Sequence, residues 1–198
     1  MQRTIFTTPG VSPCFKWLSL TCLKWAGWRV EGQLPAHAHK SVLIAAPHTS
    51  NWDLPMTLMV AFALELRPRW MGKASIFRWP FGSLMRWLGG IPVDRSQSNN
   101  LVATSAQAIR DAAEPLQLIV PPEGTRSKTR HWKTGFYYIA HSAQVPIVMA
   151  YMDYAAKRSG LGPLFEPTGD VEADMAQIKA FYQPFKGKNA DQFEADSH

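Results

Sequence analysis

Short apolar runs alternate with longer segments of helical composition along most of the chain. The predicted strands cover residues 41–47, 70–73, 91–93, 116–120 and 145–151, and the predicted helices cover 14–29, 56–66, 81–88, 101–113, 132–142 and 171–182. This alternation predicts an α/β fold with a central mixed, largely parallel sheet covered by helices. The length of 198 residues, without linker or repeat, indicates a single domain over residues 1–198.

Polar residues follow the ends of three of these apolar runs. His48 lies between the strand 41–47 and a helix start that Asp53 signals, because a capping side chain with proline in the first turn favours a helix. The other two clusters cover residues 89–95 and 123–127. Ligands of α/β sheets bind beyond the carboxyl ends of strands, so all three clusters are candidate site residues.

The segment 14–29 predicts an N-terminal amphipathic helix that lies on a membrane surface. Its main apolar stripe consists of Phe15, Leu18, Cys22 and Trp25, with lysines and an arginine beside it. Indoles prefer the lipid headgroup region and basic side chains are attracted to anionic lipid, so we expect residues 15–28 and 78–87 to face a bilayer. The alternative is that these tryptophans are core residues with solvated neighbours.

The net charge of +6 and the pI of about 9.5 favour an anionic partner, which includes nucleic acid, lipid headgroups and CoA-like substrates. No secretory signal or transmembrane helix is expected, because the longest stretch without formal charge, 134–152, contains glycine, histidine, glutamine and proline. Cys14 and Cys22 are too far apart on one helix to pair, which fits a reducing compartment. We therefore expect a peripheral protein on the cytoplasmic face of a membrane.

His48 and Asp53 are the candidate catalytic pair. On a regular helix a spacing of five would separate their side chains by about 140°, but a loop before the helix can bring them together. The carboxylate would then bind one imidazole nitrogen and leave the other free to take a proton from a hydroxyl. The alternatives are an Asp53 that only caps the helix and a His48 that is an ordinary loop residue.

The cluster at 123–127 combines side chains that suit a phosphate. Arg126 could bind it bidentately, Gly124 would let backbone amides approach it, and Glu123 would orient a donor. The alternative is a surface turn with a local ion pair. Residues 89–95 offer a second arginine, Arg95, after a short strand.

Taken in order, residues 48–53, 90–95, 122–127 and 145–147 resemble the four motifs of the glycerolipid acyltransferase family, which includes the lysophosphatidic acid acyltransferases. The resemblance covers residues 40–151. It implies that His48 is the general base, that Asp53 is its partner, and that the acceptor's phosphate is bound by Arg95, Glu123, Gly124, Thr125 and Arg126. It also implies a lipid acceptor and acyl-CoA or acyl carrier protein as co-substrate, with no cofactor and no metal.

Pro121 and Pro92 depart from the pattern of the family and leave the identity of the acceptor open. A direct transfer is expected, because the chain has no Gly-x-Ser-x-Gly nucleophile motif and neither cysteine is near His48 in sequence. A basic, aromatic-rich module that binds nucleic acid or membranes without catalysis is the alternative function. A zinc hydrolase is weaker, because His37 and His39 have no third ligand nearby in sequence. No chemistry is assigned to the residues after Tyr151.

Overall fold

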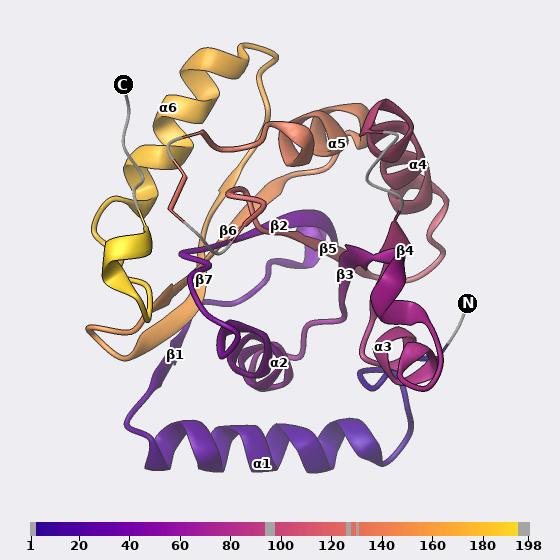
Figure 1. Ribbon diagram of the computed structural model, residues 1–198, viewed down its shortest axis with the longest axis vertical. Helices are drawn as coiled ribbons and strands as arrows, with labels where there is room; N and C mark the ends of the chain where they lie inside the picture. Colours follow the sequence, from indigo (N-terminus) through magenta and orange to yellow (C-terminus); the bar gives the residue numbers. More distant parts are fainter. Residues whose placement is uncertain (1–2, 94–97, 126–127, 130, 194–198) are drawn as a thin grey trace.

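A seven-stranded sheet forms the centre of the protein in a computed structural model, which describes residues 3–93, 98–125, 128–129 and 131–193 (Figure 1). Its strand order is β1-β7-β6-β2-β5-β3-β4. The strands are β1 (Arg29–Glu31), β2 (Lys40–Ala46), β3 (Pro68–Lys73), β4 (Gly90–Val93), β5 (Leu116–Val120), β6 (Ile147–Asp153) and β7 (Arg158–Phe165). The five strands from β6 to β4 are parallel, and β7 pairs antiparallel with β6. The prediction of a mixed, largely parallel sheet is confirmed.

Helices cover both faces of this sheet. They are α1 (Val11–Trp25), α2 (Asp53–Ala63), α3 (Gly82–Trp87), α4 (Ser98–Asp111), α5 (Gly135–Ala143) and α6 (Val171–Tyr182), with short 3₁₀ turns at Ala36–Ala38, Ala74–Phe77 and Ala190–Gln192. Figure 1 shows α4, α5 and α6 above the sheet and α2 below it, with α1 outside α2.

Alternating side chains of the central strand β2 explain this layering. Val42, Ile44 and Ala46 are buried in the core cluster that includes α4, α5 and α6, whereas Leu43 is buried in the cluster under α2. The outermost helix, α1, packs on α2, and Phe15 stacks on Phe62 with ring centroids 5.3 Å apart. The chain is thus three layers deep, with a fourth layer added by α1 on one side.

The strands β1 and β7 were not predicted. Glycines and a proline interrupt the apolar pattern of β7, and β1 has only three residues, two of them charged. Gly160 is required where these strands pair, because a Cβ there would lie 2.0 Å from the backbone oxygen of Glu31. Strand pairing explains this glycine, whereas the sequence alone makes it resemble a loop residue.

The predicted helix 14–29 is displaced and its amphipathic pattern is not confirmed. α1 begins after Gly10 and ends at Trp25, because Gly27 adopts the left-handed φ of 75° that ends the helix. Its buried residues are Ser19 and Leu23, whereas Trp17 and Trp25 are 68% and 88% exposed. The helix has large apolar side chains on both faces, and the predicted contact of its apolar stripe with a membrane stays a prediction. In the part of the chain that the structure describes, we find no helix long and apolar enough to cross a membrane.

Candidate active site

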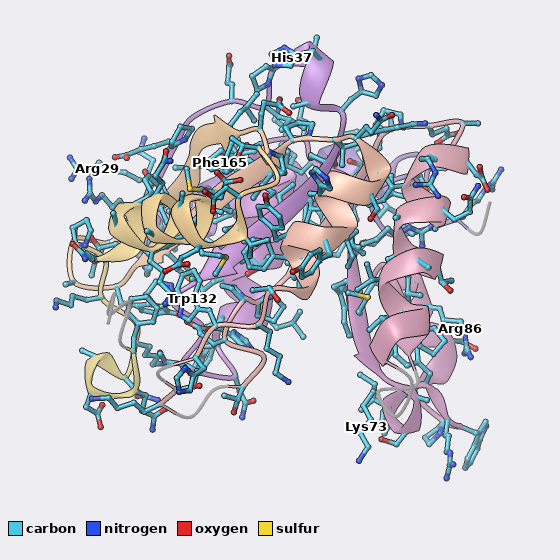
Figure 2. All side chains as sticks on the ribbon, turned by 90° about the horizontal axis from the view of Figure 1, so that it is seen from above. Arg29, His37, Lys73, Arg86, Trp132 and Phe165 are labelled. Carbon is cyan, nitrogen blue, oxygen red and sulfur yellow. The ribbon has the colours of Figure 1, made fainter. Side chains whose placement is uncertain are left out.

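The candidate residues that the structure describes gather at the carboxyl edge of the parallel strands. His48 follows β2, and Glu123 follows β5, which pairs in parallel with β2. Figure 2 places Lys73, at the end of β3, opposite His37, which precedes β2. The candidate zinc ligand His37 is therefore at the other end of the sheet from His48 and Glu123.

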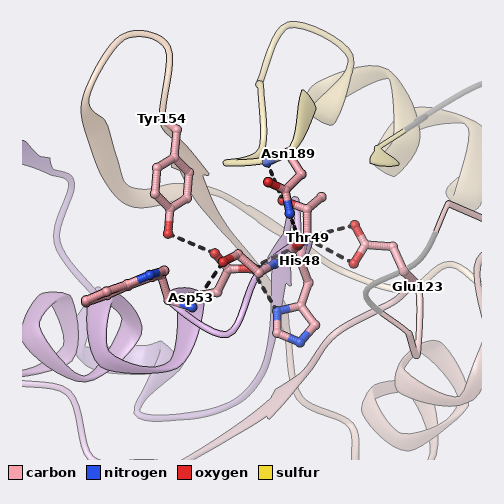
Figure 3. Close-up of polar contacts among 8 residues, drawn as sticks. His48, Thr49, Asp53, Glu123, Tyr154 and Asn189 are labelled. Carbon is pink, nitrogen blue, oxygen red and sulfur yellow. Dashed lines mark hydrogen bonds and ion pairs between the residues drawn. The ribbon is translucent and has the colours of Figure 1, made fainter. Parts of the chain in front are cut away.

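The side chains of His48 and Asp53 meet across the loop that joins β2 to α2. Nδ1 of His48 lies 3.1 Å from Oδ2 of Asp53 (Figure 3). The Asp53 side chain is 5% exposed and the His48 side chain 30% exposed. Among the residues that the structure describes, none hydrogen bonds to Nε2 of His48. The loop therefore brings the pair together as its spacing allowed, with one imidazole nitrogen held and the other available.

Asp53 organises the loop in front of its helix. Its Oδ2 accepts hydrogen bonds from the amides of Thr49 and Ser50, both at 2.9 Å. Asp53 is the first residue of α2, and no side chain caps the helix. The prediction that Asp53 caps this helix is therefore wrong. The carboxylate points back to the loop because the loop carries its donors.

Hydrogen bonds hold the Asp53 carboxylate in its ionised form. Burial alone would raise its pKa, but hydrogen bonds from His48, the Ser50 amide and Tyr154 outweigh burial and lower the pKa below 3.8. An ionised carboxylate is the form that can stabilise a protonated imidazole.

Glu123 is buried under the same loop. Its two carboxylate oxygens each accept from the backbone amide of His48 at 3.1 Å. Burial raises its pKa to about 7, against the opposing effect of the His48 hydrogen bond and charge. The side chain that was expected to orient a donor for phosphate instead holds the backbone of the candidate base.

Two residues from the C-terminal part of the chain complete the network, and sequence reasoning missed both. The hydroxyl of Tyr154 donates to Oδ1 of Asp53 at 2.8 Å. Asn189 donates from its backbone to Oγ1 of Thr49 at 3.2 Å and from its side chain to the backbone oxygen of Thr49 at 2.8 Å. Tyr154 directly follows β6, a parallel neighbour of β2, so the rule that identified His48 would have found it once the strand order was known.

A groove of about 530 Å³ runs along the exposed side of the pair. This volume is within the range of about 300–1,000 Å³ that ligand pockets occupy. Gly124, Thr125 and Lys73 line it together with His48. Its remaining wall is mainly apolar and includes Leu54, Leu58, Trp70, Met71, Ile76 and Ile119.

The two predicted arginines, Arg95 and Arg126, lie outside the described residues. Their predicted binding of phosphate stays a prediction. Among the described residues, no three His, Cys, Asp or Glu side chains gather as a metal site would require.

A family model described as Acyltransferase matches residues 27–153, which include every motif discussed above. The chain belongs to this family. The resemblance inferred from the order of the motifs is thereby confirmed.

Two acyltransferases show how far the similarity extends. The chain is 30% identical over 125 residues to a probable 1-acyl-sn-glycerol-3-phosphate acyltransferase of Mycoplasma pneumoniae. That match covers 55% of this chain and 43% of the relative, so the chain spans less than half the length of the curated relative that it matches. The crystal structure of the 1-acyl-sn-glycerophosphate acyltransferase from Thermotoga maritima superimposes with a TM-score of 0.61 at 16% identity, over 90% of this chain and 81% of the other. This second match shows a shared fold.

Proposed function

We propose that this acyltransferase family member moves a fatty acyl group from a thioester to the hydroxyl of a lysophospholipid-like acceptor in phospholipid biosynthesis or remodelling. The observation that carries the proposal is the His48–Asp53 contact of 3.1 Å beside a largely apolar groove. The names of the two similar acyltransferases, both of which act on acylglycerol phosphates, support an acceptor of this class. The donor is acyl-CoA or the acylated form of acyl carrier protein.

In this proposal His48 is the general base. Nε2 takes the proton of the acceptor hydroxyl as its oxygen attacks the thioester carbonyl, and Asp53 stabilises the resulting imidazolium. The tetrahedral intermediate then collapses, the carbon–sulfur bond breaks, and the leaving thiolate takes the proton from Nε2. The products are an ester and a free thiol, and His48 is restored without a covalent acyl-enzyme.

The groove suits an acyl chain with a polar end near His48. A second cavity, lined by Leu43, Val60 and Leu161 and also touched by the pair, holds only about 50 Å³. This volume is far below the ~300–1,000 Å³ of ligand pockets, so the second cavity is too small for a long acyl chain. We assign the fatty acyl chain of the substrate to the groove along α2 and β3. The acceptor's phosphate is then bound by Arg95, Arg126 and the backbone near Gly124 and Thr125.

The protein acts at a membrane surface in this proposal. Trp17 and Trp25 expose most of their surface on α1, and Trp79, between β3 and α3, is 93% exposed. Lys24, Arg78 and Arg86 lie near them in sequence. Exposed indoles among basic residues favour an anionic lipid surface, where a lipid acceptor is found.

Release of free thiol tests the proposal. Purified protein is incubated with long-chain acyl-CoA or with acyl carrier protein that carries a long acyl chain, and with a panel of lysophospholipids in vesicles. We expect release that depends on the acceptor, and a fall of kcat by a factor of about 10²–10⁴ in His48→Ala. His37→Ala is the matched control, because His37 lies at the other end of the sheet (Figure 2).

Each other outcome points to a different error. Equal activity in His48→Ala would remove His48 as the base. Thiol release that is independent of any acceptor would indicate a thioesterase. A trapped acyl-enzyme would contradict direct transfer. No release with any donor, together with salt-dependent binding of an oligonucleotide, would favour the nucleic-acid-binding alternative.

A further inference from the structure

Tyr154 holds the Asp53 carboxylate from the side opposite to His48. Its hydroxyl binds Oδ1 at 2.8 Å, while Oδ2 accepts from Nδ1 of His48 at 3.1 Å (Figure 3). The two oxygens of one carboxylate are therefore bound by side chains from two different connections, β6–β7 and β2–α2. Tyr154 is one residue beyond the segment that matches the family model.

The bond at Oδ1 restricts a motion that the other bonds leave free. The amides of Thr49 and Ser50 and the imidazole of His48 all bind Oδ2. They fix the position of that oxygen, but the terminal torsion of an aspartate is broad and soft. A donor at the second oxygen fixes the plane of the carboxylate, and with it the direction in which Oδ2 accepts from the imidazole.

Tyr154 is itself held in place. The ring of Trp28 packs edge-on against it, with centroids 5.1 Å apart and planes at 89°. Its backbone amide donates to the oxygen of Lys186 at 2.9 Å. Burial, with the adjacent Asp53, raises the pKa of the phenol above 10, so the hydroxyl stays protonated and remains a donor.

We propose that Tyr154 is a positioning residue for the His48–Asp53 pair, whose hydroxyl orients the Asp53 carboxylate so that His48 presents Nε2 to the groove. This inference rests on the proposed function of His48 as general base. Tyr154 acts through Asp53 and has no contact with substrate in this scheme. Its removal should therefore lower kcat and leave the KM values unchanged.

The test is Tyr154→Phe, which keeps the ring against Trp28 and removes only the hydroxyl. We expect kcat to fall about tenfold, a part of the ~10²–10⁴ that general-base catalysis supplies, with unchanged KM for donor and acceptor. In an Asp53→Asn background the same substitution should cause no further loss, because the two residues act as one unit. Tyr137→Phe is the matched control, since it removes a similar hydroxyl bond, to Asp174 at 2.7 Å, on α5 away from the groove.

A second measurement does not depend on turnover. The proton between Nδ1 of His48 and Asp53 should give a low-field NMR signal that moves or broadens in Tyr154→Phe and not in Tyr137→Phe. If the wild type transfers no acyl group, the proposed function fails and this signal still decides the inference. Unchanged kcat, an equal loss in the Asp53→Asn background, or an unchanged signal would overturn it. Should Tyr154→Phe not fold, Trp28→Leu loosens the ring, keeps the hydroxyl and should give a smaller loss of kcat.

Discussion

The carboxylate of Glu123 binds the backbone amide of His48, whereas the carboxylate of Asp53 binds the imidazole of His48. Both Glu123 oxygens lie 3.1 Å from the His48 amide nitrogen, and Asp53 lies 3.1 Å from Nδ1. The pKa values of the two carboxylates are shifted in opposite directions. The hydrogen bonds of Asp53 lower its pKa, whereas the burial of Glu123 raises its pKa to about 7. Glu123 binds only the backbone of His48, whereas Asp53 binds both the amides of the loop and the imidazole ring.

Glu123→Gln should make stability less dependent on pH. In the wild type the folded protein binds a proton at Glu123 up to about pH 7, whereas the unfolded chain releases it near 4.5. The stability that this proton contributes is present below pH 4.5 and is lost as pH rises to about 7. Glutamine keeps an oxygen for the His48 amide and does not titrate. The free energy of unfolding of Glu123→Gln, relative to that of the wild type, should therefore rise across this pH window by at most ~3 kcal/mol.

Urea unfolding of both proteins at several pH values between about 4 and 8 measures this difference. The exposed Gln177→Ala, on α6, is the control, because it removes no titratable group. A constant difference between Glu123→Gln and the wild type at all pH values would contradict the raised pKa of Glu123.

Asp53→Asn should lose both activity and stability at neutral pH. We expect kcat to fall by a factor of about 10²–10⁴, because an amide cannot stabilise the imidazolium. The lowered pKa of Asp53 contributes stability that is present above 3.8 and is lost as pH falls through the folded-state value. The variant should therefore be less stable than the wild type at pH 7, and the gap should narrow in acid. Denaturant unfolding over a pH series measures the gap, and a gap that widens in acid would refute the assignment.

Asn189→Ala should loosen the candidate active-site loop, although Asn189 lies 140 residues from Thr49 in sequence. It removes the side-chain hydrogen bond to the Thr49 oxygen, which is worth about 1 kcal/mol. We expect a fall of several degrees in melting temperature and a several-fold fall in kcat. Gln177→Ala, at an exposed position of α6, is the matched control and should leave both unchanged. A full-activity Asn189→Ala protein would show that the loop keeps its position without this contact.

Replacing both Trp17 and Trp25 with serine should weaken binding to anionic vesicles. A large apolar side chain that leaves water contributes about 1.5–3 kcal/mol, so each tryptophan should account for tenfold or more in partitioning. The melting temperature should change little, because both residues are mostly exposed. Co-sedimentation with vesicles measures the effect, with Tyr138→Ser on α5 as the control. Retention equal to that of the wild type would exclude α1 as the lipid-binding face.

The parts of the site that lie close together in sequence could be predicted, and the parts that depend on strand order could not. His48 and Asp53 lie at the two ends of one short loop, so their spacing and the helix start were sufficient to pair them. Glu123 was identified, but its direction depends on β5 lying beside β2. Tyr154 and Asn189 required the position of β6 and of the segment after α6, which one sequence does not contain. The strand β7 was missed because Gly160 and Gly162 satisfy close packing and leave no apolar pattern.

The central position of β2 also affects how the protein must fold. The contacts that hold the His48 loop join residues that are far apart in sequence. The separation is 75 residues from His48 to Glu123, 101 residues from Asp53 to Tyr154, and 140 residues from Thr49 to Asn189. Contacts of such high sequence separation are slow to form. Catalytic competence should therefore appear last during refolding, after the sheet has assembled, and a fragment ending at residue 153 would retain every motif without a completed site.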